Sequence, residues 1–176
     1  VIRAGDRLYF AWSDKDGWNG PFPLIADGTV VRGVTGNPVL LQSTRGITGN
    51  FEVVVPLVDG GIAHYWRDND DPDLPWHGPV VFGGSRSYDA VTMIQSDFGS
   101  AGNLEVVARS HRGLFLLWDD ARHWHGPRRI RVDGEAVLGT RGAPSLIQRT
   151  GTLGDFELVV PRVGGGLAHY TRNNDA

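Results

Sequence analysis

One six-residue pattern occurs three times in this chain, as FEVVVP at 51–56, LEVVAR at 104–109 and FELVVP at 156–161. Other patterns recur around it in the same order. A short apolar run ends in glutamine at Gln42, Gln95 and Gln148, so the repeat is 53 residues long. Self-similarity at a fixed period of this length is typical of folds built by stacking one supersecondary unit.

Each repeat contains four short apolar runs of strand length. In the central copy they cover 90–95, 104–108, 114–119 and 125–130, and they are bounded by Gly, Asp, Asn and Pro. Runs rich in Val, Ile, Leu and aromatic residues predict β-strands, and no stretch keeps a helical period over ten residues. A β-solenoid would repeat at about 20–30 residues, which is shorter than the period observed. A β-sandwich would not need the same side chains at equivalent positions of every repeat. The sequence therefore predicts an all-β fold of four-stranded antiparallel blades, as in a β-propeller.

The phase of the repeat predicts how the chain is divided. Val1 aligns with Val54, inside a second strand, and the chain holds about 3.3 repeats. The longest connections, 26–37 and 131–142, are expected to lead from the outer edge of one blade to the axis of the next. We expect one propeller segment over 1–176, with a partial blade at 1–25, full blades at 38–82 and 90–130, and a partial blade at 143–176.

The two ends of the chain overlap instead of completing one blade, because both carry second and third strands. Open blade edges expose unpaired backbone groups and favour association. Two explanations stay open: the chain is a fragment of a longer propeller of roughly six to eight blades, or several copies close into one ring as a homo-oligomer. A monomer of 19.2 kDa in solution would exclude the ring.

The composition excludes several classes of protein. Hydrophobic residues make up 40% and charged residues 21%, which is ordinary for a globular domain. The net charge of −3 argues against nucleic-acid binding, and the basic cluster Arg128, Arg129 and Arg131 is interpreted as a solvated strand face. Without cysteine there is neither a disulfide framework nor thiolate chemistry. No apolar run approaches the ~20 residues that span a membrane.

Three tryptophans stand before Gly-Pro at the expected start of an outer strand: Trp18, Trp76 and Trp124. An exposed indole can stack on the apolar face of a sugar, and His77 and His125 follow two of the tryptophans. We therefore name Trp18, Trp76, Trp124, His77 and His125 as candidate carbohydrate-binding residues. The alternative, that one Trp per blade packs between neighbouring blades, stays open.

The third strand carries further candidates. His64 and Trp66 share one strand face, and Tyr65 and Arg67 share the other. We name His64, Trp66 and Arg67 as candidate sugar ligands, beside the alternative that they make inter-blade hydrogen bonds.

No catalytic residue is predicted. The recurring carboxylates are interpreted as structural, no pair of carboxylates has a spacing that marks a glycosidase, and no Gly-x-Ser-x-Gly motif occurs. These carboxylates are Glu52, Glu105 and Glu157.

No cofactor is expected, and calcium is the one cation left open. The acidic runs 14–17 and 68–73 resemble parts of a calcium loop, but neither completes the pattern. His123 and His125 share a strand face, yet the sequence gives no evident third metal ligand.

With this phasing the repeat resembles the blade of the bacterial fucose-binding propeller lectins, the seven-bladed type of insect-associated bacteria. The resemblance spans nearly the whole chain, but the second Trp of the family's turn is proline here, and one third-strand aromatic is missing. It implies a sugar-binding propeller with sites between blades, extracellular and attached to a secreted enzyme or toxin. The segments that carry it are 143–147, 156–160, 167–170 and 76–79.

Two functions are therefore expected. The first is a non-catalytic carbohydrate-binding module for fucose-like or other monosaccharides. The alternative is a protein-interaction or scaffold propeller, or an accessory domain of a larger secreted enzyme or toxin.

Overall fold

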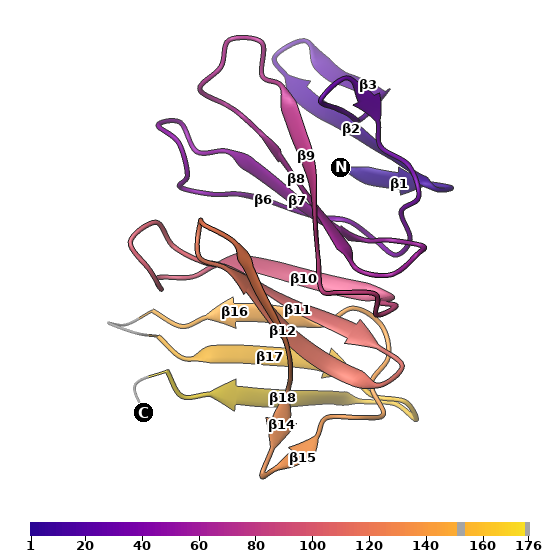
Figure 1. Ribbon diagram of the computed structural model, residues 1–176, viewed down its shortest axis with the longest axis vertical. Coiled ribbons are helices and arrows are strands. Elements are labelled where there is room, and N and C mark those ends of the chain that lie inside the picture. Colours follow the sequence, from indigo (N-terminus) through magenta and orange to yellow (C-terminus); the bar gives the residue numbers. More distant parts are fainter. Residues whose placement is uncertain (151–153, 175–176) are drawn as a thin grey trace. The chain divides into compact units, whose positions relative to one another are not determined.

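The computed structural model describes residues 1–150 and 154–174 (Figure 1), and within them every regular element is a β-strand. Those residues include no helix with the length and apolar character that crossing a membrane requires. The chain divides into two compact units, an N-terminal unit (Val1–Ser87) and a C-terminal unit (Tyr88–Ala176). That the whole chain forms one propeller segment stays a prediction.

The C-terminal unit begins with a complete four-stranded antiparallel sheet whose strands follow chain order (Figure 1). The four strands expected in the central repeat are confirmed to within one or two residues. The inner pair is buried on both faces, which explains its nearly continuous apolar sequence. The strands are β10 (Ala90–Gln95), β11 (Leu104–Ser110), β12 (Gly113–Asp119) and β13 (Trp124–Arg129).

A second sheet of the C-terminal unit packs against the first. Its antiparallel strands are β16 (Ser145–Gln148), β17 (Phe156–Pro161) and β18 (Leu167–Arg172). Val107 and Leu114 from the first sheet meet Phe156 and Leu158 from the second in one buried cluster. The two blades of this unit therefore share a core.

The N-terminal unit repeats this arrangement with two further sheets. Leu8 of the first sheet and Leu24, which directly follows its last strand, pack with Val53, Tyr65 and Trp76 of the second. The first sheet consists of β1 (Ile2–Ala4), β2 (Arg7–Asp14) and β3 (Gly17–Pro23), and the second contains β6 (Val39–Gln42), β7 (Phe51–Pro56), β8 (Ile62–Arg67) and β9 (Trp76–Phe82).

The long connections carry short strands that the sequence did not predict. Each forms a two-residue hairpin around an Asp-Gly turn in which both residues have positive φ, 45° and 78° at Asp27-Gly28 and 49° and 84° at Asp133-Gly134. Asp-Gly is the usual signal for such a turn. The strands are β4 (Ile25–Ala26), β5 (Thr29–Val30), β14 (Arg131–Val132) and β15 (Glu135–Ala136), and β4 also pairs with β9.

The glycine of each Trp-x-Gly-Pro motif has a backbone role. Gly20, Gly78 and Gly126 have φ of 101°, 112° and 95°. A Cβ at these positions would lie 2.7–2.8 Å from a carbonyl oxygen of the neighbouring third strand. The pairing of third and fourth strands shifts register at this place in all three repeats. The repeated motif thus marks a β-bulge in each of the three blades whose fourth strand is described.

Candidate functional site

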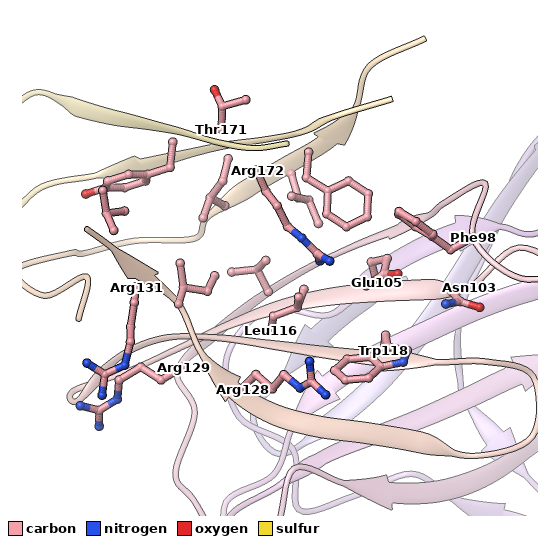
Figure 2. A pocket seen from close by; sticks show the side chains of 17 residues that line it. Phe98, Asn103, Glu105, Leu116, Trp118, Arg128, Arg129, Arg131, Thr171 and Arg172 are labelled. Carbon is pink, nitrogen blue, oxygen red and sulfur yellow. The ribbon is translucent and has the colours of Figure 1, made fainter. Parts of the chain in front are cut away.

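A cavity of about 600 Å³ lies between the two sheets of the C-terminal unit (Figure 2). One wall comes from β11 and β12, where Glu105 and Trp118 are directly opposite each other and so share a face. The other wall comes from β17 and β18, which contribute Phe156, Tyr170 and Arg172. The cavity is therefore a site between two neighbouring blades.

Glu105 supplies a buried carboxylate to this cavity. Glu105 is only 4% exposed, and the Ser96 hydroxyl donates a hydrogen bond to Glu105 Oε1 at 3.3 Å. Burial raises the pKa of the Glu105 carboxyl, against the opposing effects of the Ser96 hydrogen bond and the Arg172 charge. Figure 2 shows Arg172 reaching from β18 toward Glu105. A hydrogen-bond acceptor and a cationic donor thus converge in one space.

The repeat explains why Glu105 faces the cavity without an imidazole partner. In the other repeats the equivalent carboxylate pairs with a histidine on the third strand: Glu52 with His64, and Glu157 with His169. In the central repeat that position is Leu116, which lies opposite Val107 and lines the cavity. At the cavity the Glu105 carboxylate therefore has Ser96 and Asn103 as hydrogen-bond partners in place of an imidazole.

Trp118 presents an aromatic ring at the same cavity. His125, its partner across β12 and β13, stacks on the ring with centroids 5.0 Å apart and planes inclined by 13°. The Arg128 guanidinium lies 4.8 Å from the ring centroid. The Trp118 ring therefore contacts two neighbours on β13, and one of them, Arg128, is an exposed side chain.

Positive charge gathers along the cavity. Four arginines are among its lining residues, Arg128, Arg129, Arg131 and Arg172, and Glu105 is the carboxylate among them. The Arg129 guanidinium, however, lies over the Phe115 ring on the opposite face of the sheet, and Arg131 Nη1 donates a hydrogen bond to the Gly134 carbonyl oxygen. Figure 2 shows Arg129 and Arg131 together, at the end of the cavity opposite Phe98 and Asn103. The basic cluster interpreted from the sequence as a solvated strand face is indeed exposed, but it also lines a cavity.

The third-strand candidates of the N-terminal unit are divided between two faces, as the alternation predicts. The Trp66 ring lies 5.7 Å from the His64 ring and 5.4 Å from the His77 ring. Arg67 is on the other face, where its guanidinium lies 4.3 Å from the centroid of the Phe51 ring. A site of the kind seen in the C-terminal unit therefore combines the tryptophan of one blade with the arginine of the next.

The three Trp-x-Gly-Pro tryptophans have three different environments. Trp18 is 80% exposed, Trp76 is buried in the core of the N-terminal unit, and Trp124 is half-buried. None of them lines the cavity between β10–β13 and β16–β18. Their role in sugar binding stays a prediction.

The candidate histidines are each paired with a carboxylate. His64 Nε2 lies 2.7 Å from Glu52 Oε2 inside the sheet, and both residues are buried. His77 Nδ1 lies 2.8 Å from Asp27 Oδ1 at an exposed position. His125 pairs with Asp120. Ligand binding by any of these imidazoles stays a prediction.

The acidic run 68–73 is used within the protein. Both carboxylate oxygens of Asp70 accept hydrogen bonds, from the backbone N–H of Ile47 at 2.6 Å and from the backbone N–H and hydroxyl of Thr48 at 2.8 Å. These bonds, with the Ile47 backbone first, lower the pKa of Asp70. This aspartate therefore closes the 43–50 loop, and the idea of a calcium loop gains no support.

Glu105→Gln is expected to remove a pH-dependent part of the stability. Because the folded-state pKa of Glu105 is raised above 4.5, the wild-type carboxyl contributes full stability below that pH and loses it as the pH rises through the raised pKa. Urea unfolding between pH 4 and 8 should show the wild type losing stability relative to Glu105→Gln as the pH increases. Parallel curves for the two proteins would contradict the burial of this carboxyl.

Comparison with known proteins identifies a similar fold but no protein family. No protein-family model and no curated protein matches it. Among solved structures, the chain is similar to the BP39L lectin from Burkholderia pseudomallei, with a TM-score of 0.73 and 21% identity over 97% of this chain and 46% of that one. The chain thus spans about half the length of that lectin. The likeness confirms the predicted all-β fold of antiparallel propeller blades.

Proposed function

We propose that this chain is a non-catalytic saccharide-binding module and that the cavity between β10–β13 and β16–β18 is one of its binding sites. The observation that carries the proposal is the convergence of an aromatic ring, a buried carboxylate and a guanidinium in one cavity, from Trp118, Glu105 and Arg172. The likeness of the fold to a lectin supports it.

The chemistry of the lining suits a sugar. The C–H face of a pyranose can pack on the Trp118 ring once the Arg128 guanidinium turns aside. Ring hydroxyls can donate to Glu105 and accept from Arg172, while Phe156 and Leu158 offer an apolar wall to a methyl group such as that of a 6-deoxy sugar. A volume of about 600 Å³ lies within the usual range of 300–1,000 Å³ for small-molecule sites.

The direct test compares cavity variants with a matched exposed tryptophan. Hydrogen bonds to charged groups contribute about 1.5–3 kcal/mol, so Arg172→Ala should weaken binding to the best glycan of an array by about 10- to 100-fold. Trp118→Ala should weaken it comparably. Trp18→Ala removes an indole that is 80% exposed and should leave the affinity unchanged.

Two outcomes would contradict the proposal in different ways. Loss of binding in Trp18→Ala but not in Trp118→Ala would move the site to the Trp-x-Gly-Pro motifs. Failure of the folded wild type to bind any glycan would favour the alternative of a protein-interaction propeller.

The charge of the lining predicts a preference among glycans. The Arg128 and Arg172 guanidinium groups outnumber the single Glu105 carboxylate, and this favours a saccharide that carries a carboxylate or sulfate group. Acidic glycans should bind more tightly than neutral ones, and their advantage should shrink as salt rises above 0.1 M, where the screening length is about 10 Å. Replacing Arg128, whose guanidinium lies over the Trp118 ring, by glutamine should reduce the acidic advantage and retain neutral binding. An advantage that is insensitive to salt would contradict this assignment.

A further inference from the structure

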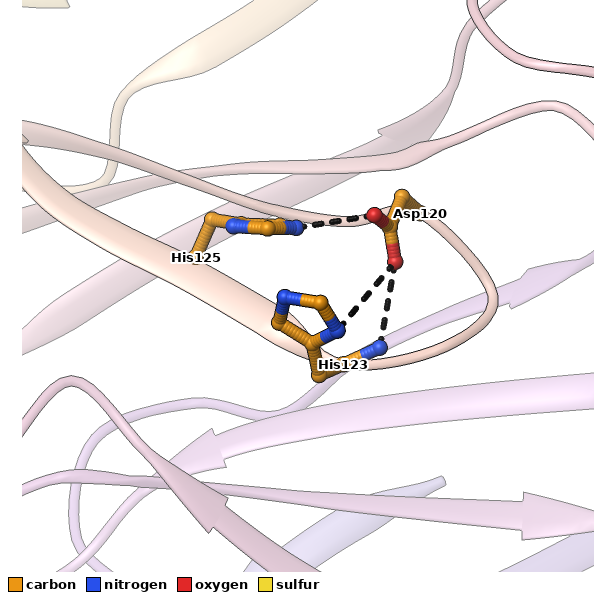
Figure 3. Close-up of side chains that lie close together, drawn as sticks. All are labelled: Asp120, His123 and His125. Atoms are coloured by element: carbon orange, nitrogen blue, oxygen red, sulfur yellow. Dashed lines mark hydrogen bonds and ion pairs between the residues drawn. The ribbon is translucent and has the colours of Figure 1, made fainter.

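A cluster of three metal-ligating side chains lies on the hairpin between β12 and β13 (Figure 3). The ligand atoms of Asp120, His123 and His125 all lie within 4.8 Å of one another. His125 Nε2 is 2.9 Å from Asp120 Oδ2, and His123 Nδ1 is 3.9 Å from Asp120 Oδ1. Asp120, which directly follows β12, thus supplies the third ligand that the His-Trp-His motif lacked in the sequence.

The first hairpin of the chain shows which part of this cluster the turn itself needs. Its residues at the three equivalent positions are Asp14, Gly17 and Asn19. Asn19 donates a hydrogen bond to Asp14 Oδ2 at 2.8 Å, just as His125 bonds to Asp120. The carboxylate and its partner therefore belong to the turn.

His123 is what the later hairpin adds. Glycine occupies its place in the first hairpin, so the turn does not require an imidazole there. The His123 ring centroid lies 4.1 Å from that of His125, and its side chain is 65% exposed. His123 is thus an exposed side chain that the turn does not require. Its imidazole adds a third ligand to the contact between Asp120 and His125.

We propose that Asp120, His123 and His125 form a binding site for a divalent transition metal ion of the Zn²⁺ class. Two imidazoles and one carboxylate are ligands that Zn²⁺, Ni²⁺ and Cu²⁺ accept. Bonds of about 2.0–2.2 Å to one ion place ligand atoms roughly 3–4 Å apart, so a small rotation of the His123 side chain brings the three into range. The exposed position leaves the fourth place to water.

The site is distinct from the saccharide cavity, because none of its three residues lines that cavity. The two are nevertheless neighbours, since His125 stacks on Trp118. Metal binding should therefore change the fluorescence of Trp118, which gives a readout that does not depend on any sugar.

The experiment titrates untagged, chelator-treated protein with ZnCl₂ by calorimetry and with NiCl₂ by tryptophan fluorescence. The wild type should bind one ion per chain in the micromolar range. His123→Gly combined with His125→Asn puts the residues of the first hairpin at these two positions, so it should keep the turn and lose at least tenfold in affinity. His111→Ala removes an exposed imidazole from another hairpin and should bind as the wild type does.

Each result bears on the proposal. Weaker binding in the double variant with a native circular dichroism spectrum supports it. Equal binding in the wild type and the double variant, or binding by the wild type only above millimolar concentrations, overturns it.

Discussion

Replacing His64 by alanine is expected to lower the free energy of unfolding by about 3–5 kcal/mol, the usual cost of removing one partner from a buried ionic pair. Glu52 is 1% exposed and His64 5% exposed, and His64 Nε2 lies 2.7 Å from Glu52 Oε2. The Ser43 hydroxyl donates to the other carboxylate oxygen at 2.8 Å. Without the imidazole, the Glu52 carboxylate would retain the serine and lose its cationic or N–H partner in a site closed to water.

Urea unfolding of three variants separates this pair from a general effect of losing an imidazole. His77→Ala removes a histidine whose partner Asp27 is exposed, so stability should change little. Replacing both His64 and Glu52 by leucine removes the polar pair completely and should recover most of the stability lost in His64→Ala. Equal losses in His64→Ala and His77→Ala would show that the buried pair does not stabilise the sheet.

The strands of this fold were predictable because they are long, apolar and bounded by turn residues. The runs at 90–95 and 114–119 became β10 and β12 almost unchanged. The hairpins β4–β5 and β14–β15 were not predictable from the sequence, because two-residue strands are too short to show a hydrophobic period. Their Asp-Gly turns were the remaining signal.

The sequence predicted the types of residue in the candidate site, but not which of these residues share one cavity. Trp66 and Arg67 are neighbours in sequence, and alternation along the strand sends them to opposite faces. Which tryptophan meets which arginine depends on how one blade faces the next, as Trp118 meets Arg172 across the cavity. Packing between sheets determines this, and a single repeat carries no record of it.

The role of the Trp-x-Gly-Pro motif leads to the second large effect. Gly78→Ala is expected to destabilise the protein by more than the roughly 1–3 kcal/mol typical of a strained backbone conformation. Gly78 has φ of 112°, and a Cβ there would lie 2.7 Å from the carbonyl oxygen of His64 and 3.1 Å from the Tyr65 ring. A backbone carbonyl within a paired strand cannot move aside as a flexible side chain can, so relief requires opening the bulge between β8 and β9.

Gly17→Ala is the matched control, because Gly17 has a similar φ of 123° and a Cβ there would meet nothing within 4 Å. Both variants carry the strain of positive φ, and only Gly78→Ala adds the overlap with the neighbouring strand. Chemical denaturation of the two proteins therefore isolates the steric part of the cost. If they lose equal stability, the repeated glycine serves the turn alone, and the bulge would not explain why Gly-Pro recurs in all three of the Trp-x-Gly-Pro motifs.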